Sequence, residues 1–198
     1  MLLAACWRTS GRPLETIAEP QPSDIALREE LAAAPECLQI IRIEVGKREH
    51  MLRAYCKSGA VVTMTVAIGR DEIGPKLRSG DDRTPEGKYR ISGLPRQGRF
   101  HLFIPIDYPS EEDADAARAE GRISEADYDR IIDAHGAGVP PPYDTALGGD
   151  IGFHGEGERW EGDSEHLDWT YGCVALSDDE IDFLASRTET GVTVWIYP

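Results

Sequence analysis

The chain has 198 residues, 40% of them hydrophobic, and a formal net charge of −15. This length can bury a proper core and favours a single domain, with or without a tail. The acidic excess argues against nucleic acid or an anionic membrane surface as a partner, because most of the protein would repel phosphates. The sequence holds no run of about 18 apolar residues, so we predict no transmembrane span.

Residues 1–37 are predicted to form an N-terminal tether or leading helix. The stretch from Asp24 to Ala34 has a helical pattern that Ser23 or Asp24 can cap. The first six residues, MLLAAC, resemble the lipobox at which bacterial lipoproteins are cleaved and acylated, which makes Cys6 a candidate lipidation site. Only five residues precede Cys6, too few for a signal peptide. Either the true start lies upstream, or the match is chance and the segment is an ordinary flexible terminus.

From Leu38 onward the pattern changes to the alternation that is typical of strands. Ile41, Ile43 and Val45 alternate with charged residues, and 51–56 alternates again, which predicts a hairpin. Further strands are predicted at Val61–Ile68, Lys88–Ser92, Phe100–Ile104, Asp150–Phe153 and Val192–Tyr197. Strands without βαβ alternation favour a mostly β sandwich or barrel.

Two short helical insertions interrupt this β pattern. Residues 110–133 are acidic and helical, with Gly121 separating two helices and Ser124 capping the second. Residues 134–149 are rich in glycine and proline, and we expect a long loop there that can form a wall of a site. Ser177 is predicted to cap a last helix that runs from Asp178 to about Arg187.

The four cysteines, Cys6, Cys37, Cys56 and Cys173, are too few and too scattered for a disulfide scaffold. Cys37 and Cys56 flank the predicted hairpin and could bridge in an oxidising compartment, but two small buried residues are the favoured interpretation. The cysteines include no CxxC pair, and the histidines show no HExxH or HxxxH spacing. We therefore predict no metal.

Two reactive side chains lie in one stretch: His154 in Gly-Phe-His-Gly and Cys173 in Thr-Tyr-Gly-Cys. A histidine at a strand end can act as a base, and a cysteine near a helix start or an imidazole can act as a nucleophile. Taken alone, each residue is more often structural than catalytic.

Their pairing resembles a known signature. A His-Gly, a gap, and then Thr-x-Gly-Cys is similar to the motif of the L,D-transpeptidase catalytic domain, the YkuD-like family of bacterial cell-wall enzymes. The segment Ser79-Gly-Asp-Asp-Arg-Thr-Pro-Glu-Gly87 looks like that family's Gly-Asp-x-x-Thr-Pro-x-Gly, and Gly148–Gly155 looks like its strand into the catalytic histidine. The resemblance runs from about Leu38 to the carboxyl terminus, so residues 38–198 are expected to be the catalytic domain.

The resemblance implies an L,D-transpeptidase-like β-sandwich that acts on peptidoglycan stem peptides in the bacterial cell envelope or periplasm, without a cofactor. Cys173 is then the nucleophile, His154 its general base, and the Gly155 carbonyl orients the imidazole. Backbone N–H groups of Gly172 and Cys173, with that of Tyr171, are expected to form the oxyanion hole. The resemblance carries no prediction of the oligomeric state.

Two positions depart from the family pattern. Many members carry histidine where Tyr171 stands, and asparagine or arginine where Ala175 stands. The sequence around Cys173 looks more like the YafK-like branch, which includes a hydrolase. The alternatives to transpeptidation are therefore a hydrolytic amidase or L,D-carboxypeptidase of the same fold, or a non-catalytic envelope-binding module. A binding module needs neither His154 nor Cys173, which disfavours the last alternative.

Four residues outside the motifs are candidates for substrate binding. Lys76 and Arg78 can meet a substrate carboxylate, or they can lie in a solvated loop. Trp169 and Tyr143 can shape the walls of the site, although aromatic residues more often serve packing.

Overall fold

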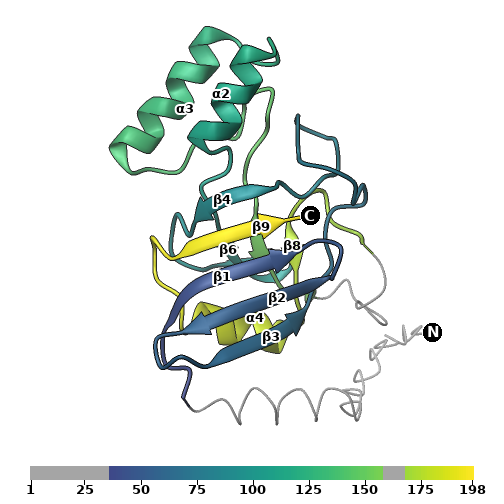
Figure 1. Cartoon of the computed structure of the whole chain (residues 1–198), viewed down its shortest axis with the longest axis vertical. Coiled ribbons are helices and arrows are strands. Elements are labelled where there is room, and N and C mark those ends of the chain that lie inside the picture. Colours follow the sequence, from purple (N-terminus) through teal and green to yellow (C-terminus); the bar gives the residue numbers. More distant parts are fainter. Residues whose placement is uncertain (1–35, 158–167) are drawn as a thin grey trace, which may run out of the picture.

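The computed structural model describes residues 36–157 and 168–198. The fold is mostly β, as predicted, with two sheets and three helices in this part of the chain (Figure 1). The expected helix at 24–34 and Cys6 lie outside the described residues. No helix among the described residues has the length and apolar character that crossing a membrane requires.

The first sheet has the strand order β3–β2–β1–β9–β4. The predicted hairpin is present, because β1 pairs with β2 in antiparallel register and places Gly46 opposite Met51. Strand β9 pairs in parallel with β1 and antiparallel with β4, which joins the end of the chain to its middle. The bounds are β1 Ile40–Gly46, β2 Met51–Cys56, β3 Val61–Thr65, β4 Gly87–Arg90 and β9 Thr193–Tyr197.

The second sheet has the order β5–β6–β7–β8, with bounds Arg96–Gly98, His101–Pro105, Gly152–His154 and Val174–Ala175. Its register produces two rows of side chains that face opposite sides. Ile104, Phe153 and Val174 are aligned across β6, β7 and β8 and belong to the main hydrophobic core. Phe103, His154 and Ala175 form the next row, so they lie on the other face of the sheet.

Helices α2 (Glu111–Ala119) and α3 (Glu125–Ala137) form a hairpin beyond the β4 edge of the first sheet (Figure 1). Ser110 and Ser124 cap them, and α3 ends at Gly138, whose φ of 66° is left-handed. The hairpin has a small core of its own, made of Ala114, Ala117, Ile123, Ile131 and Leu147.

Three of the predicted boundaries need correction. The loop expected from 134 begins later, because α3 continues to Ala137. The strand expected at Val61–Ile68 ends at Thr65, although Ala67 still forms an isolated bridge to Ala175. The last helix, α4, is capped by Ser177 as predicted but spans only Asp178–Ala185. Ile181 and Leu184 of α4 are fully buried and join the main core.

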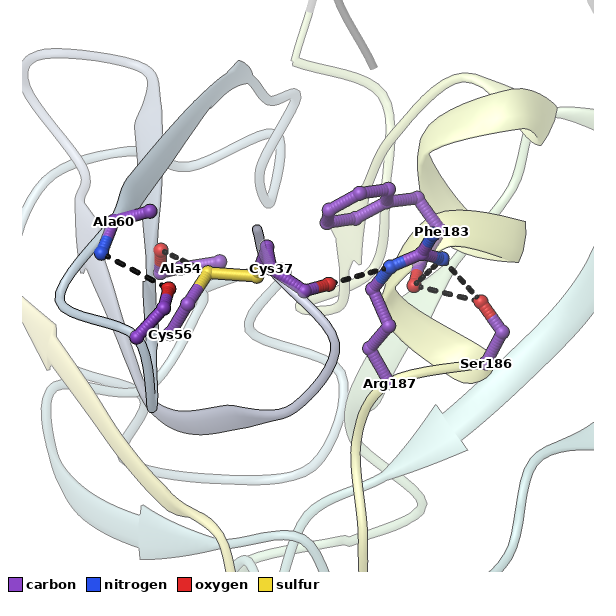
Figure 2. Close-up of a disulfide and its surroundings, with 8 residues drawn as sticks. Cys37, Ala54, Cys56, Ala60, Phe183, Ser186 and Arg187 are labelled. Carbon is purple, nitrogen blue, oxygen red and sulfur yellow. Dashed lines mark hydrogen bonds between the residues drawn. A yellow bond between two sulfur atoms is a disulfide. The ribbon is translucent and has the colours of Figure 1, made fainter. Parts of the chain in front are cut away.

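Cys37 and Cys56 form a disulfide, which corrects the favoured interpretation that they are two unlinked buried residues (Figure 2). The β1–β2 register places Cys56 opposite Ile40, and the chain before Ile40 brings the Cys37 Cα within 5.2 Å of the Cys56 Cα. Arg187, just after α4, donates from Nε to the Cys37 carbonyl at 2.8 Å. The disulfide therefore ties the start of the described chain to the first hairpin.

Candidate active site

Strands β7 and β8 bring His154 and Cys173 together. They pair in parallel, with Phe153 opposite Val174 and His154 opposite Ala175. The same register puts Cys173, just before β8, beside Gly152. Since alternate residues of a strand face the same side, Cys173 lies on the His154 face, as its diagonal neighbour on the adjacent strand.

The imidazole of His154 is held on several sides. It is only 4% exposed, Phe100 stacks on it with ring centroids 5.0 Å apart, and Trp169 meets it edge-on at 5.4 Å. Its Nδ1 lies 2.7 Å from the Gly155 carbonyl oxygen, the contact that the resemblance implies. Because a carbonyl only accepts, Nδ1 carries the hydrogen in the neutral ring and Nε2 keeps a free lone pair.

The protonation state of His154 suits a base. Burial lowers the pKa of His154 below its ordinary 6.5, and this outweighs the Gly155 carbonyl, which raises it. The ring is therefore neutral at pH 7, and its Nε2 can take up a proton.

The loop after His154 is fastened to the first residue of α4. Asp178 Oδ1 accepts hydrogen bonds from the backbone N–H of Glu156 at 2.8 Å and of Gly157 at 3.0 Å. This approach is so close that a Cβ at Gly155 would lie 2.3 Å from the same oxygen. Glycine at 155 thus lets Asp178 fix the loop whose carbonyl orients His154.

Cys173 is the free cysteine among the described residues, and it is partly exposed. Its Sγ lies 3.8 Å from the Asp150 carbonyl oxygen. Burial raises the pKa of the Cys173 thiol to about 11, although the Gly152 N–H and the charges of Lys76 and Arg96 lower it. At neutral pH the resting site thus pairs a protonated thiol with a neutral imidazole.

Two threonines support the cysteine loop. Thr170 Oγ1 donates to the Cys173 carbonyl at 2.7 Å. Thr84, fully buried, also donates to this carbonyl at 3.5 Å and accepts from the Gly69 N–H at 2.9 Å. The Thr-Pro segment that was recognised in the sequence therefore contacts the cysteine loop across 89 positions of the chain.

Gly172 differs from the expectation for the oxyanion hole. Its N–H donates to Thr170 Oγ1 at 3.1 Å, so this donor is already used within the chain. Glycine is needed here for the backbone, because φ is 130° and a Cβ would lie 2.6 Å from the Arg83 carbonyl oxygen. The N–H groups of Tyr171 and Cys173 stay the candidates for the oxyanion hole.

Lys76, a candidate for substrate binding, is buried and paired within the chain in this structure. It is 5% exposed, and its Nζ donates to Asp81 Oδ1 at 2.8 Å and to the Arg78 carbonyl at 3.1 Å. Arg78 is exposed, and its backbone N–H donates to the Asp81 carboxylate at 3.0 Å. The turn around Asp81 thus neutralises the buried cation of this basic segment.

The aromatic candidates divide into two groups. Trp169 lies in the site, against His154. Tyr143 is 73% exposed, but its backbone packs so closely on Gly149 that a Cβ there would lie 2.7 Å from the Tyr143 Cα. Tyr171 is 63% exposed, with the Arg70 guanidinium 4.4 Å from its ring centroid. The side chains of Tyr143 and Tyr171 therefore face solvent.

Sequence reasoning missed Phe100 and Arg96 as site residues. Arg96 belongs to β5, where it is opposite Phe103, the residue that is itself opposite His154. No alternation marked this strand, because all three of its residues are exposed. Phe100 was assigned to a strand and not to the site.

One further group has metal-binding residue types. His50, Glu72 and Asp168 place their ligand atoms within 4.8 Å of one another. Asp168 already accepts from the Ile68 N–H at 2.8 Å and lies 3.0 Å from His50 Nε2. These contacts give the cluster a structural role in joining the segment before Cys173 to the first sheet, and we assign no metal to it.

The fold and the site define a β-sandwich protein with a histidine on β7 and a cysteine directly before the adjacent strand β8. The chain belongs to the L,D-transpeptidase catalytic domain family (YkuD), which matches residues 40–196. A search of curated proteins gave no match.

Solved structures that are similar to this chain include the following three. Bdellovibrio bacteriovorus Bd1075 is 19% identical, with 83% of this chain and 50% of that one covered and a TM-score of 0.44. An L,D-transpeptidase from Xylanimonas cellulosilytica is 16% identical, with 89% of this chain and 70% of that one covered and a TM-score of 0.43. An Enterococcus faecium L,D-transpeptidase is 12% identical, with 81% of this chain and 50% of that one covered and a TM-score of 0.45. The chain spans about half the length of the first and the third.

Proposed function

We propose that this protein is a cysteine acyltransferase that acts on peptidoglycan stem peptides as an L,D-transpeptidase, through a thioester on Cys173. The observation that carries the proposal is the parallel β7–β8 register, which puts Cys173 and His154 on one face. The contact between His154 Nδ1 and the Gly155 carbonyl adds the fixed tautomer that a general base needs.

In the first half-reaction, the Cys173 sulfur attacks the carbonyl of a diamino acid residue while His154 Nε2 takes the thiol proton. Backbone N–H groups of Tyr171 and Cys173 stabilise the oxyanion. When the tetrahedral intermediate collapses, the C–N bond breaks, the imidazolium returns its proton to the leaving amine, and a D-amino acid departs. The acyl group remains on sulfur as a thioester.

In the second half-reaction, an amine or water attacks the thioester, and His154 accepts the proton of the attacking group. When the tetrahedral intermediate collapses, the C–S bond breaks, and the imidazolium returns its proton to the departing sulfur, which restores the thiol. The neutral starting pair fits this scheme, because each half-reaction begins with a base that is free to accept a proton.

Hydrolysis is the second candidate, as in an amidase or L,D-carboxypeptidase. Ala175 lies directly opposite His154 and is 2% exposed, so it brings no polar group to a position where the family often has one. This absence favours the smallest acceptor, water, over a bound peptide amine.

Peptidoglycan lies outside the cytoplasm, and we place the protein in the cell envelope. The Cys37–Cys56 disulfide supports this location, since disulfides persist in oxidising compartments. We further propose that residues 1–37 act as a tether, with Cys6 as the lipidation site. To test for a lipid on Cys6, the protein is expressed together with its genomic upstream sequence and its intact mass is measured.

The main test incubates the protein with muropeptides and a D-amino acid and reads the products by mass spectrometry. We expect a product in which the added amine replaces the terminal D-amino acid, and a thioester adduct on the intact protein. Only hydrolysed product would select the second candidate. Cys173→Ala should abolish both products; if it leaves them unchanged, the enzyme proposal fails and an envelope-binding role stands.

A further inference from the structure

An exposed ion pair lies beside the Cys173 sulfur and has no part in the steps above. We propose that Arg96 and Asp150 form a subsite for a zwitterionic amino-acid head group, one that carries an ammonium and a carboxylate on the same carbon. The inference rests on the proposed function, because it names the part of the substrate that this site binds.

The position of Arg96 follows from the sheet register. Arg96 is opposite Phe103, which is opposite His154, so all three side chains lie on one face of the sheet. The guanidinium lies 4.5 Å from the Phe103 ring centroid, which holds its stem over the sheet. Arg96 is therefore a cation on the same face as the base.

Asp150 connects this cation to the nucleophile. Its Oδ1 accepts from Arg96 Nη2 at 2.5 Å, and its carbonyl oxygen is the one 3.8 Å from Cys173 Sγ. The charges of Asp150 and Arg96 act on the thiol in opposite directions, which agrees with their place beside it. A group held by this pair is thus next to the reacting sulfur.

Both side chains are open to solvent, with 55% of Arg96 and 61% of Asp150 exposed. An exposed ion pair contributes little to stability, so a ligand can replace it at small cost. The guanidinium has five N–H donors and the carboxylate two acceptor oxygens, which leaves donors and an oxygen for a ligand. Buried Lys76, in contrast, is paired with Asp81 and has no such access.

The opposite charges of Arg96 and Asp150 together select the kind of ligand. A simple anion at Arg96 would be repelled by Asp150, and a simple cation at Asp150 would be repelled by Arg96. A zwitterionic head presents its carboxylate to the guanidinium and its ammonium to the carboxylate, so both charges are matched. Such a head occurs at the free end of a diaminopimelate side chain and in a free D-amino acid, whereas a lysine side chain lacks the carboxylate.

The test compares kcat/KM for two tetrapeptide donors, one with diaminopimelate and one with lysine at the acylated position. For Arg96→Gln and for Asp150→Asn we expect kcat/KM to fall by about 10- to 100-fold with diaminopimelate, mainly through KM, and by less than about twofold with lysine. The matched control is Arg130→Gln, because Arg130 of α3 and Asp144 of the loop that follows it form a similarly exposed ion pair at 2.5 Å. We expect no change for it with either donor.

Equal losses on both donors would overturn the subsite and give the pair a purely structural role at Cys173, and so would no loss on either donor together with an unchanged acceptor KM. A second arm varies a free D-amino acid acceptor at saturating lysine donor. A raised acceptor KM in Arg96→Gln would place the zwitterion on the acceptor side, and an unchanged one together with a loss confined to the diaminopimelate donor would place it on the donor.

Binding separates this inference from the proposed function. Calorimetry in the Cys173→Ala background should show that Arg96→Gln weakens binding of a diaminopimelate tripeptide by about tenfold or more and leaves binding of the lysine tripeptide unchanged. If no muropeptide is turned over, the proposed function fails, and these binding constants still decide the subsite. Equal affinities for the two tripeptides would overturn it.

Discussion

The helical hairpin at 110–138 and the active-site edge at β7–β8 are assembled in different ways. In the hairpin, each helix is capped by the serine directly before it, and the small core comes mostly from the hairpin itself. At the active-site edge, Thr84 supports the cysteine loop, and Asp168 ties the segment before that loop to Ile68 and His50, which flank strands of the first sheet. Local contacts build the hairpin, and long-range contacts build the site.

This difference shows where the two regions are vulnerable. A change in the hairpin should reduce stability and leave the chemistry intact, because no hairpin residue contacts His154 or Cys173 in the interactions described above. A change in a distant supporting residue should reduce activity as well as stability. Five experiments test this separation.

The largest expected effect is that of His154→Ala. Removing the base should slow thioester formation by about 10²- to 10⁴-fold, the usual contribution of general acid–base catalysis. Single-turnover acylation followed by intact mass measures it. A loss below about tenfold, with the fold verified by circular dichroism, would contradict the role of His154.

The next largest effect is expected in the pH dependence of kcat/KM and of Cys173 alkylation. Since burial lowers the pKa of His154 below 6.5, kcat/KM should rise with pH only below that value and then level off. In His154→Ala, alkylation of Cys173 should instead rise about tenfold per pH unit toward the thiol pKa of about 11, because no base takes the proton. A wild-type profile that rises from pH 7 to 10 would contradict a neutral-imidazole base.

Thr84→Val tests the long-range support. The isosteric change leaves the Gly69 N–H without its acceptor in a buried site, which should cost about 1–3 kcal/mol in unfolding free energy. It should also slow acylation, because the Cys173 carbonyl loses a donor. Thr63→Val on the exposed side of β3 is the control. Unchanged acylation in Thr84→Val would remove Thr84 from the support of the site.

The disulfide separates stability from chemistry. Cys37→Ser/Cys56→Ser opens a link across 19 positions, which should lower the unfolding free energy by about 3 kcal/mol. Acylation at 25 °C should stay as in the wild type, because the link lies at the first hairpin. Reductant should lower the wild-type Tm and leave that of the variant unchanged. Equal Tm values without reductant would show that the link adds no stability.

The smallest effect is expected for Ser124→Ala in the hairpin. Losing the cap that accepts the Asp127 N–H at 3.1 Å should cost about 1 kcal/mol of stability with no change in acylation. Chemical denaturation and the single-turnover assay measure the two quantities. A slower acylation step would show that the hairpin is coupled to the site.

The difference between local and long-range contacts also decides which features the sequence could predict. The caps of the helical hairpin act within a few residues of themselves, so the pattern of 110–133 predicts two helices with Ser124 capping the second. The first β-hairpin is also a local feature, and its alternation predicts it. Because the register of β7 against β8 joins residues about twenty positions apart, His154 and Cys173 were paired through a family resemblance and not through periodicity.

Where prediction failed, the missing information was spatial. The burial of Lys76 depends on the turn that brings Asp81 to it, and the bonding of Gly172 depends on the conformation around Thr170. The pairing of Cys37 with Cys56 needs the path of the chain before β1. Arg96 lies in a strand of three exposed residues, which has no hydrophobic pattern to recognise.

The raised pKa of Cys173 also affects how this protein survives where disulfides form. Oxidation by peroxides and disulfide exchange both begin with attack by the thiolate, so a thiol with a pKa of about 11 reacts slowly in both. The same chain can therefore keep Cys37 and Cys56 oxidised while Cys173 stays reduced. In the proposed mechanism, the raised pKa of Cys173 thus limits oxidation of the resting thiol, and His154 takes its proton during attack on the substrate carbonyl.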